Sequence, residues 1–178
     1  MRYTIILLLI LLVACGEEDS LSRDIEWTQQ NSTELNKNLV VDEQIEIKLF
    51  LEMHKDWDIK ETGSGLQYFI YEQGVEDTAH TPKAGDIAEI EYVISLLDGT
   101  ECYRTKEDEY EEFIVDNSEI ETGVQEGIKK MSIGDRAKLI IPSHLGHGLI
   151  GDMDKIPPLT TLVIDIYLMG IITRCKNL

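Results

Sequence analysis

In one segment of the chain, apolar side chains recur at every second position. They are Ala88, Ile90, Tyr92, Ile94 and Leu96, and polar residues separate several of them: Glu89, Glu91 and Ser95. Successive side chains of a strand point to opposite faces, so the segment Asp86–Leu97 predicts a strand in a sheet with one buried face and one solvated face. The dipeptide Asp98-Gly99 then predicts a tight turn that returns the chain antiparallel through residues 100–104.

Other segments have strand patterns of the same kind. They are residues 66–71, 113–115, 137–141 and 162–168. Between them, one helical stripe is expected from Ile120, Val124, Ile128 and Met131. Two capping boxes compete for the start of this helix: Ser118 with Glu121, and Thr122 with Gln125. One short helix among mostly antiparallel strands predicts an α+β domain over residues 61–172.

A second helix is predicted ahead of the strands, within residues 41–60. Asp42 is the expected N-cap, and Ile45, Leu49 and Met53 follow at intervals of four residues. Ile47, Phe50 and Leu51 widen this stripe, so we expect the helix to pack on its own domain. Residues 15–40 are mostly polar and are predicted to be a flexible tether.

The N-terminus has the pattern of an export signal over residues 1–14. Arg2 precedes the apolar run Ile5–Val13, which is too short to span a hydrocarbon core of roughly 30 Å as a helix. The tetrad Leu12-Val13-Ala14-Cys15 resembles the lipobox of bacterial lipoproteins. This resemblance implies a lipid on Cys15, a bacterial membrane as partner, and a location in the cell envelope, on its periplasmic or outer-membrane face. The alternative is a plain secretory signal with an incidental cysteine.

Composition excludes several classes of protein. The chain has 178 residues, of which 43% are hydrophobic, and a formal net charge of −18. Wholesale disorder and a disulfide framework do not fit these values, and so acidic a chain is not expected to bind nucleic acid. With Cys15 assigned to lipid, Cys102 and Cys175 remain, as one disulfide or as two thiols.

Three segments carry a resemblance to a known family. Residues 127–138, 148–151 and 156–163 look like the helix, the next strand and the tip loop of the FKBP-type peptidyl-prolyl isomerases. The likeness runs from Leu66 to Ile171 and implies a half-barrel sheet wrapped around the helix, with a prolyl-peptide pocket between them. The lipobox, the helix near Asp42 and the segment Thr62–Leu66 more specifically resemble gliding-motility-associated lipoproteins of this family.

The resemblance also implies which residues form the pocket. Tyr92 stands at the wall tyrosine, and Ile120 and Ile156 match residues whose backbones hold the ligand's carbonyls. Several other pocket positions depart from the family. Cys102 replaces a deep aromatic, Tyr103 an aspartate, Glu111 a wall aromatic, Glu121 an apolar residue, Val124 the tryptophan of the floor, His147 a tyrosine donor and Ile164 the last aromatic.

Two functions are compatible with such a pocket. Rotation about an X–Pro bond needs an apolar cleft and no nucleophile, metal or proton relay, so no cofactor is expected for an isomerase that acts on proline-containing segments of exported proteins. The alternative is a catalytically weak module that holds clients, or a partner in an envelope or motility machine, through the same cleft. A metal site is a rival interpretation of four loop residues: His144, His147, Asp152 and Asp154.

The negative charge is concentrated beside the expected pocket. Between Lys106 and Glu126 there are nine acids: Glu107, Asp108, Glu109, Glu111, Glu112, Asp116, Glu119, Glu121 and Glu126. These side chains are either a rim that selects basic or neutral peptides, with Glu111 and Glu121 nearest the substrate, or simply a solvated surface.

Overall fold

A computed structural model describes residues 29–74, 80–117 and 119–173. Its helices are α2 (Gln29–Met53), α3 (Thr122–Ile128) and the short 3₁₀ helix η2 (Ser143–Leu145), and its strands are β1 (Lys60–Glu61), β2 (Gln67–Glu72), β3 (Ile87–Leu96), β4 (Glu101–Arg104), β5 (Glu111–Ile114), β6 (Arg136–Ile141) and β7 (Leu162–Ile172). The chain divides within α2 into two compact units, residues 1–36 and 37–178. The smaller unit contributes only the first turns of α2 to the described residues, and the larger unit contains all the strands.

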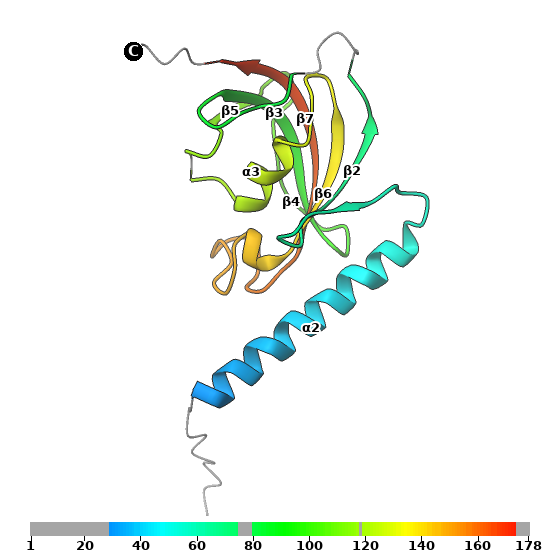
Figure 1. Ribbon diagram of the computed structural model, residues 1–178, viewed down its shortest axis with the longest axis vertical. Helices are drawn as coiled ribbons and strands as arrows, with labels where there is room; N and C mark the ends of the chain where they lie inside the picture. The colour runs from blue at the N-terminus through cyan, green and yellow to red at the C-terminus, as the bar shows by residue number, and fades with distance from the viewer. Residues whose placement is uncertain (1–28, 75–79, 118, 174–178) are drawn as a thin grey trace, which may run out of the picture. The chain divides into compact units, whose positions relative to one another are not determined.

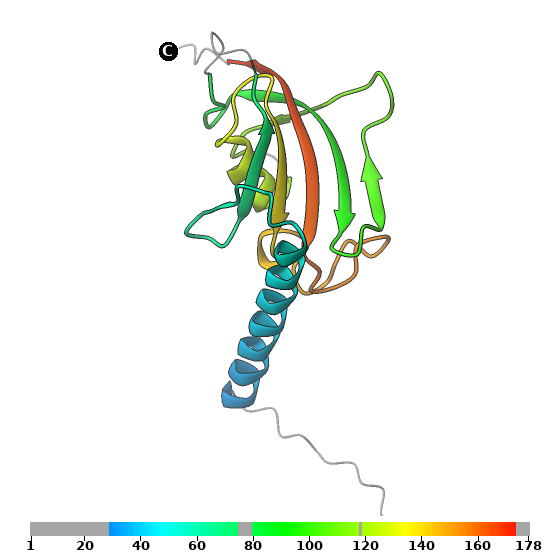
Figure 2. The same cartoon turned by 90° about the vertical axis from the view of Figure 1, so that its right-hand side faces the viewer.

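Within the described residues the strands form one seven-stranded antiparallel sheet in the order β1-β2-β6-β7-β3-β4, with β5 also paired to β3. The strands curve in the same direction (Figure 2), and α3 lies against one face of the sheet (Figure 1). We call this face the inner face. The architecture confirms the predicted α+β fold class, a sheet wrapped around one short helix with a helical N-terminal extension.

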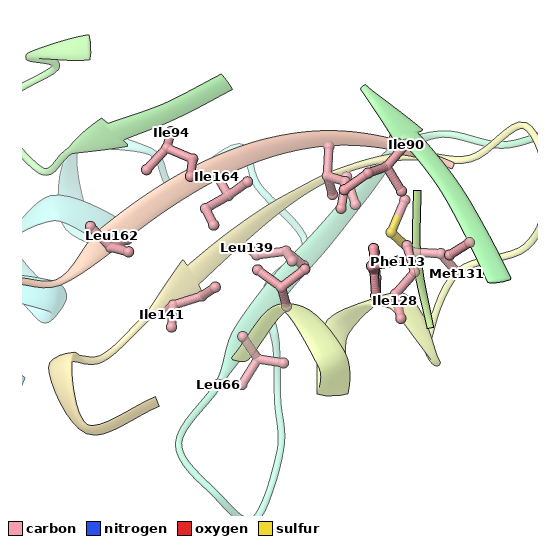
Figure 3. Packing of buried hydrophobic residues seen from close by; sticks show 14 of the residues in the cluster. Leu66, Ile90, Ile94, Phe113, Ile128, Met131, Leu139, Ile141, Leu162 and Ile164 are labelled. Atoms are coloured by element: carbon pink, nitrogen blue, oxygen red, sulfur yellow. The ribbon is translucent and has the colours of Figure 1, made fainter. Parts of the chain in front are cut away.

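The core lies between the inner face and α3. On β3, Ala88, Ile90 and Ile94 are buried, as the alternating pattern predicts. The alternating residues of β7 are almost fully buried: Leu162, Ile164, Ile166 and Leu168. Side chains of β6, β7 and α3 point toward one another in this layer (Figure 3).

The start of α3 differs from both capping boxes. The N-cap is Glu121, which has no side-chain capping hydrogen bond. Thr122 is already inside the helix, and the Gln125 Oε1 atom accepts a hydrogen bond from the backbone N–H of Asp116 at 2.9 Å. The box of Thr122 with Gln125 is therefore wrong, because Gln125 satisfies a backbone donor of the preceding turn. Ser118 lies outside the described residues.

The prediction for α2 is wrong in its start and in its buried face. The helix runs from Gln29, so Asp42 lies in its interior, and residues 29–40 are helical instead of a tether. No glycine or proline interrupts residues 29–53, so the sequence contains no strong helix breaker ahead of Asp42. Residues 15–28 of the predicted tether lie outside the described residues.

The face of α2 that packs on the domain carries Ile47 and Phe50, which form a second apolar cluster with Ile140 of β6 on the outer face of the sheet. Ile45, Leu49 and Met53 are instead 52%, 61% and 73% exposed. The helix therefore has two apolar stripes, and the one that carries Ile47 and Phe50 meets the sheet. Among the described helices, none has both the length and the apolar composition needed to cross a bilayer.

The loop between β6 and β7, residues 142–161, is called the tip loop below. It begins with η2 and contains two non-glycine residues with positive φ, Met153 (63°) and Leu159 (56°). On the neighbouring strand β4, Cys102 is a free, buried thiol, and Cys175 lies outside the described residues.

Candidate active site

A pocket of about 230 Å³ lies between the inner face of the sheet and the start of α3. Its lining combines apolar residues of β3, β7 and α3 with three carboxylates. The lining residues are Ile90, Tyr92, Ile94, Glu111, Glu119, Ile120, Glu121, Val124, Ile164 and Ile166. Six of the predicted site residues are therefore brought together: Tyr92, Glu111, Ile120, Glu121, Val124 and Ile164.

The floor of the pocket is apolar and well packed. Ile90, Val124 and Ile164 are 3%, 4% and 1% exposed. Val124 belongs to α3, and Ile90 and Ile164 belong to the alternating inner faces of β3 and β7. Because no aromatic ring lines this floor, a bound apolar group would contact branched aliphatic side chains.

Tyr92 forms one wall and is held by Glu111. The Tyr92 hydroxyl donates a hydrogen bond to Glu111 Oε1 at 2.8 Å, across the paired strands β3 and β5. Burial and this bond to a carboxylate raise the pKa of Tyr92 above its usual value. Because its O–H is donated to Glu111, the Tyr92 hydroxyl can act toward the pocket only as a hydrogen-bond acceptor.

Glu121 connects the pocket to the tip loop. Its Oε1 atom lies 2.9 Å from Nε2 of His147, and both side chains are largely shielded from solvent. This contact joins the N-cap of α3 to a loop that follows β6. His147 therefore lies at the edge of the pocket, through Glu121, and is not among the lining residues.

Cys102, Tyr103 and Ile156 lie outside the pocket lining. Cys102 is 3% exposed, its Sγ atom lies 3.7 Å from the backbone oxygen of Lys155, and burial raises its pKa. Tyr103 donates a hydrogen bond to Asp152 of the tip loop. Together these contacts fix β4 to the tip loop.

The contact between Tyr103 and Asp152 changes both titrations. The hydrogen bond from the hydroxyl lowers the pKa of Asp152 to about 2, and the same bond to a carboxylate raises the pKa of Tyr103 to about 12. Lys155 adds a cation over the Tyr103 ring, 4.6 Å from its centroid.

The backbone of Ile156 is not free for its predicted role, which is to hold a carbonyl of the ligand. Its N–H donates to Asp152 Oδ1 at 2.8 Å, and its carbonyl accepts from the N–H of Asp152 at 3.1 Å. Ile156 is also 3% exposed. Asp152 therefore already occupies the N–H and carbonyl of Ile156, the backbone groups that the resemblance implies for substrate binding.

The geometry does not support the metal site either. His144 Nε2 lies 3.0 Å from the backbone oxygen of Ser64, His147 faces Glu121, and Asp152 accepts from Tyr103. Tyr103 also donates to Asp154 at 3.3 Å, so the two aspartates share one partner, whereas each histidine has a different one. Within the described ranges no three His, Cys, Asp or Glu side chains are grouped so that they could hold a metal ion.

Sequence reasoning missed three apolar lining residues, Ile90, Ile94 and Ile166, and named Glu119 only among the nine acids of the expected rim. Ile90 and Ile94 alternate with Tyr92 on β3, and Ile166 alternates with Ile164 on β7. The period of two along each strand was therefore the signal that could have found the three isoleucines.

A larger hollow of about 780 Å³ lies on the outer face, with strand residues Glu91, Val93, Asp165 and Tyr167 in its lining. Two of its charged groups, Arg136 and Asp165, already have partners in the lining. Arg136 stacks over Tyr167 at 3.9 Å from the ring centroid, and Tyr71 donates to Asp165 at 2.6 Å. The smaller inner pocket, where apolar surface and shielding from water coincide, is therefore the candidate active site.

Comparisons with known proteins agree with this fold. The family model described as FKBP-type peptidyl-prolyl cis-trans isomerase matches residues 78–169, and the chain belongs to this family. Among its relatives, the isomerase FkpA of Aeromonas hydrophila is 34% identical over 113 residues, 64% of this chain and 40% of the relative. The FK506-binding protein 1 of Yarrowia lipolytica is 37% identical over 92 residues, 51% of this chain and 84% of the relative.

Two solved structures of this family have the same fold. The crystal structure of FkpA from Escherichia coli aligns with a TM-score of 0.64 at 28% identity, covering 79% of this chain and 64% of that one. A peptidyl-prolyl cis-trans isomerase from Pseudomonas syringae pv. tomato aligns with a TM-score of 0.63 at 25% identity, covering 77% and 96%. In the sequence comparison, the chain spans only 40% of the length of FkpA from Aeromonas hydrophila.

Proposed function

We propose that the chain is a peptidyl-prolyl cis-trans isomerase and that the inner pocket is its active site. The observation that carries this proposal is the shielded aliphatic floor beside Tyr92. An amide loses its resonance, and with it much of its dipole, when the bond is twisted halfway. A dry apolar pocket therefore stabilises the twisted X–Pro bond relative to the planar one, which lowers the barrier without a covalent step.

The carboxylates at the pocket define the proposed substrate class. Glu111, Glu119 and Glu121 line the same pocket as the aliphatic floor, and Glu111 and Glu121 have neutral or titratable partners in Tyr92 and His147. Negative charge at the mouth favours peptides with a basic or neutral residue next to proline and disfavours acidic ones. No nucleic acid is proposed as a partner, because the charge of the chain is of the wrong sign.

We further propose that the protein acts at the bacterial cell envelope on proline-containing segments of exported proteins. The support is the lipobox-like tetrad that ends at Cys15, with the short apolar run before it. Acylation of Cys15 would hold the chain on a membrane, since each buried CH₂ contributes about 0.8 kcal/mol. Cys15 lies outside the described residues, and the likeness to gliding-motility-associated lipoproteins stays a prediction. Mass spectrometry of the membrane fraction tests it: unmodified Cys15 would refute the anchor.

The activity is tested by NMR exchange spectroscopy on a Leu-Pro peptide with the purified full-length chain. The rate of cis–trans exchange should rise in proportion to protein concentration, and Tyr92→Ala should lower the catalysed rate. Tyr110→Ala is a matched control, because Tyr110 is 51% exposed and does not line the pocket. An exchange rate equal to that in buffer would rule out the isomerase.

A second candidate function is client holding without efficient isomerisation. It is favoured by the exposed apolar side chains of the tip loop, where Leu149, Ile150 and Met153 are 69%, 63% and 86% exposed. Exposed apolar groups near a peptide pocket can bind unfolded segments. This function predicts that the chain suppresses aggregation of an unfolded client and binds the Leu-Pro peptide while leaving its exchange rate unchanged.

A further inference from the structure

Glu43 is a buried carboxylate on α2, far from the pocket in sequence. It is 9% exposed and accepts three hydrogen bonds. Its Oε1 atom accepts from the backbone N–H of Ser143 at 2.6 Å and from the Thr161 hydroxyl at 2.8 Å, and its Oε2 atom accepts from the Ser143 hydroxyl at 3.1 Å.

These donors stand at the two ends of the tip loop. Ser143 is the second residue of the loop and Thr161 is its last, so one carboxylate joins both ends and connects them to α2. Ser143 and Thr161 are themselves 5% and 3% exposed. Without Glu43 the N–H of Ser143 and the Thr161 hydroxyl would lose this shared acceptor in a site that is shielded from water.

Hydrogen bonds continue from Ser143 to the edge of the pocket. The carbonyl of Ser143 accepts from the N–H of Gly146 at 3.0 Å and from the N–H of Gly148 at 2.8 Å. These two glycines flank His147, whose ring contacts Glu121 of the pocket lining at 2.9 Å. Glu43 is therefore linked to the pocket through the backbone turn that presents His147.

We propose that Glu43 is a positioning residue for the active site: it fixes the start and end of the tip loop so that His147 meets Glu121. This inference rests on the proposed function of the inner pocket. It makes residues 37–53 of α2 part of the catalytic unit, although α2 contributes no residue to the pocket lining.

The first test compares Glu43→Gln with Glu46→Gln in the full-length chain. Both changes remove one charge from α2, and Glu46 is exposed. At a temperature where both variants are fully folded by circular dichroism, Glu43→Gln should lower kcat/KM for the Leu-Pro peptide roughly tenfold, the loss typical of a hydrogen bond to a buried charged group. The amides of Gly146 and Gly148 should exchange faster with solvent in Glu43→Gln only.

A double-mutant cycle separates positioning from general stability. If Glu43 acts through His147, Glu43→Gln should have little further effect on kcat/KM in a His147→Ala background. Additive losses would overturn the proposal, as would unchanged exchange of the two glycine amides. If Glu43→Gln does not fold, Thr161→Val replaces it. This variant removes one hydrogen bond and should give a smaller loss that also disappears in the His147→Ala background.

Failure of the isomerase proposal has a different signature. If the wild-type chain does not accelerate exchange, affinity for the Leu-Pro peptide replaces kcat/KM in the same cycle. Faster glycine exchange in Glu43→Gln without any change in rate or affinity would show that the contact is merely structural and would overturn the positioning role.

Discussion

Gly123 allows α3 to approach the sheet closely enough to form the pocket floor. A Cβ atom built on Gly123 would lie 2.4 Å from Cγ2 and 3.0 Å from Cδ1 of Ile141. Ile141 is fully buried, so its side chain cannot move into solvent. Gly123→Ala should therefore push α3 away from β6 and displace Val124, the next residue, at the floor.

The magnitude follows from two opposing effects. Alanine is favoured over glycine inside a helix by up to about 1 kcal/mol. Overpacking a close-packed core costs about 1–3 kcal/mol. We expect the second effect to be larger, with a net loss of about 1–2 kcal/mol in the free energy of unfolding and a lower catalysed exchange rate. Urea denaturation measures the loss as a lower midpoint with an unchanged slope.

Gly63→Ala is the matched control. No atom lies within 4 Å of a Cβ at Gly63, so its unfolding free energy should stay within about 0.5 kcal/mol of the wild type. In an Ile141→Ala background, where the contacting methyl is absent, the cost of Gly123→Ala should vanish. A Gly123→Ala variant as stable as the wild type, or an equal cost in both backgrounds, would refute the close-approach argument.

Two further predictions concern the tip loop and α2. The folded-state pKa of Asp152 is lowered to about 2, so the contribution of Asp152 to stability is present above its unfolded pKa and is lost as pH falls through about 2. The folded-state pKa of Tyr103 is raised to about 12, so the contribution of Tyr103 is lost as pH rises through about 12. Tyr103→Phe should therefore flatten the stability profile at both extremes, which denaturation across pH measures, and an unchanged profile would contradict the coupling. Ile47→Ala should destabilise the fold by about 2–5 kcal/mol, since Ile47 is 1% exposed, whereas Ile45→Ala should be nearly neutral in the same urea assay. Equal losses at the two positions would mean that the buried face of α2 is misassigned.

Much of the fold was readable from local patterns. The strand predicted over residues 86–97 is β3, and the strand predicted over residues 162–168 forms most of β7. Period-two alternation works for β3 and β7 because their buried side chains lie on the inner face, which packs against α3. The same pattern correctly put Tyr92 and Ile164 on one side of the sheet, where both line the pocket.

Other site residues could not be placed from the sequence. Family position suggested that Ile156 offers its backbone to substrate, but Asp152 occupies that backbone with two hydrogen bonds. Tyr103 is likewise used by Asp152. Both contacts depend on how the tip loop folds back on itself and on β4, and no periodicity in the sequence records such a loop conformation.

The sequence by itself determined most of the strands, the short helix, and Val124 and Ile164 of the apolar floor, because each follows from the spacing of apolar residues along one element. Only the tertiary structure decided which apolar stripe of α2 is buried and which acidic side chain of α2 is buried with it. Glu43 reads as one more solvent-facing acid in an acidic chain, yet it lies against Ser143 and Thr161, 100 and 118 residues later. The burial of such a carboxylate depends on donors brought to it by the fold, so only the assembled structure could show it.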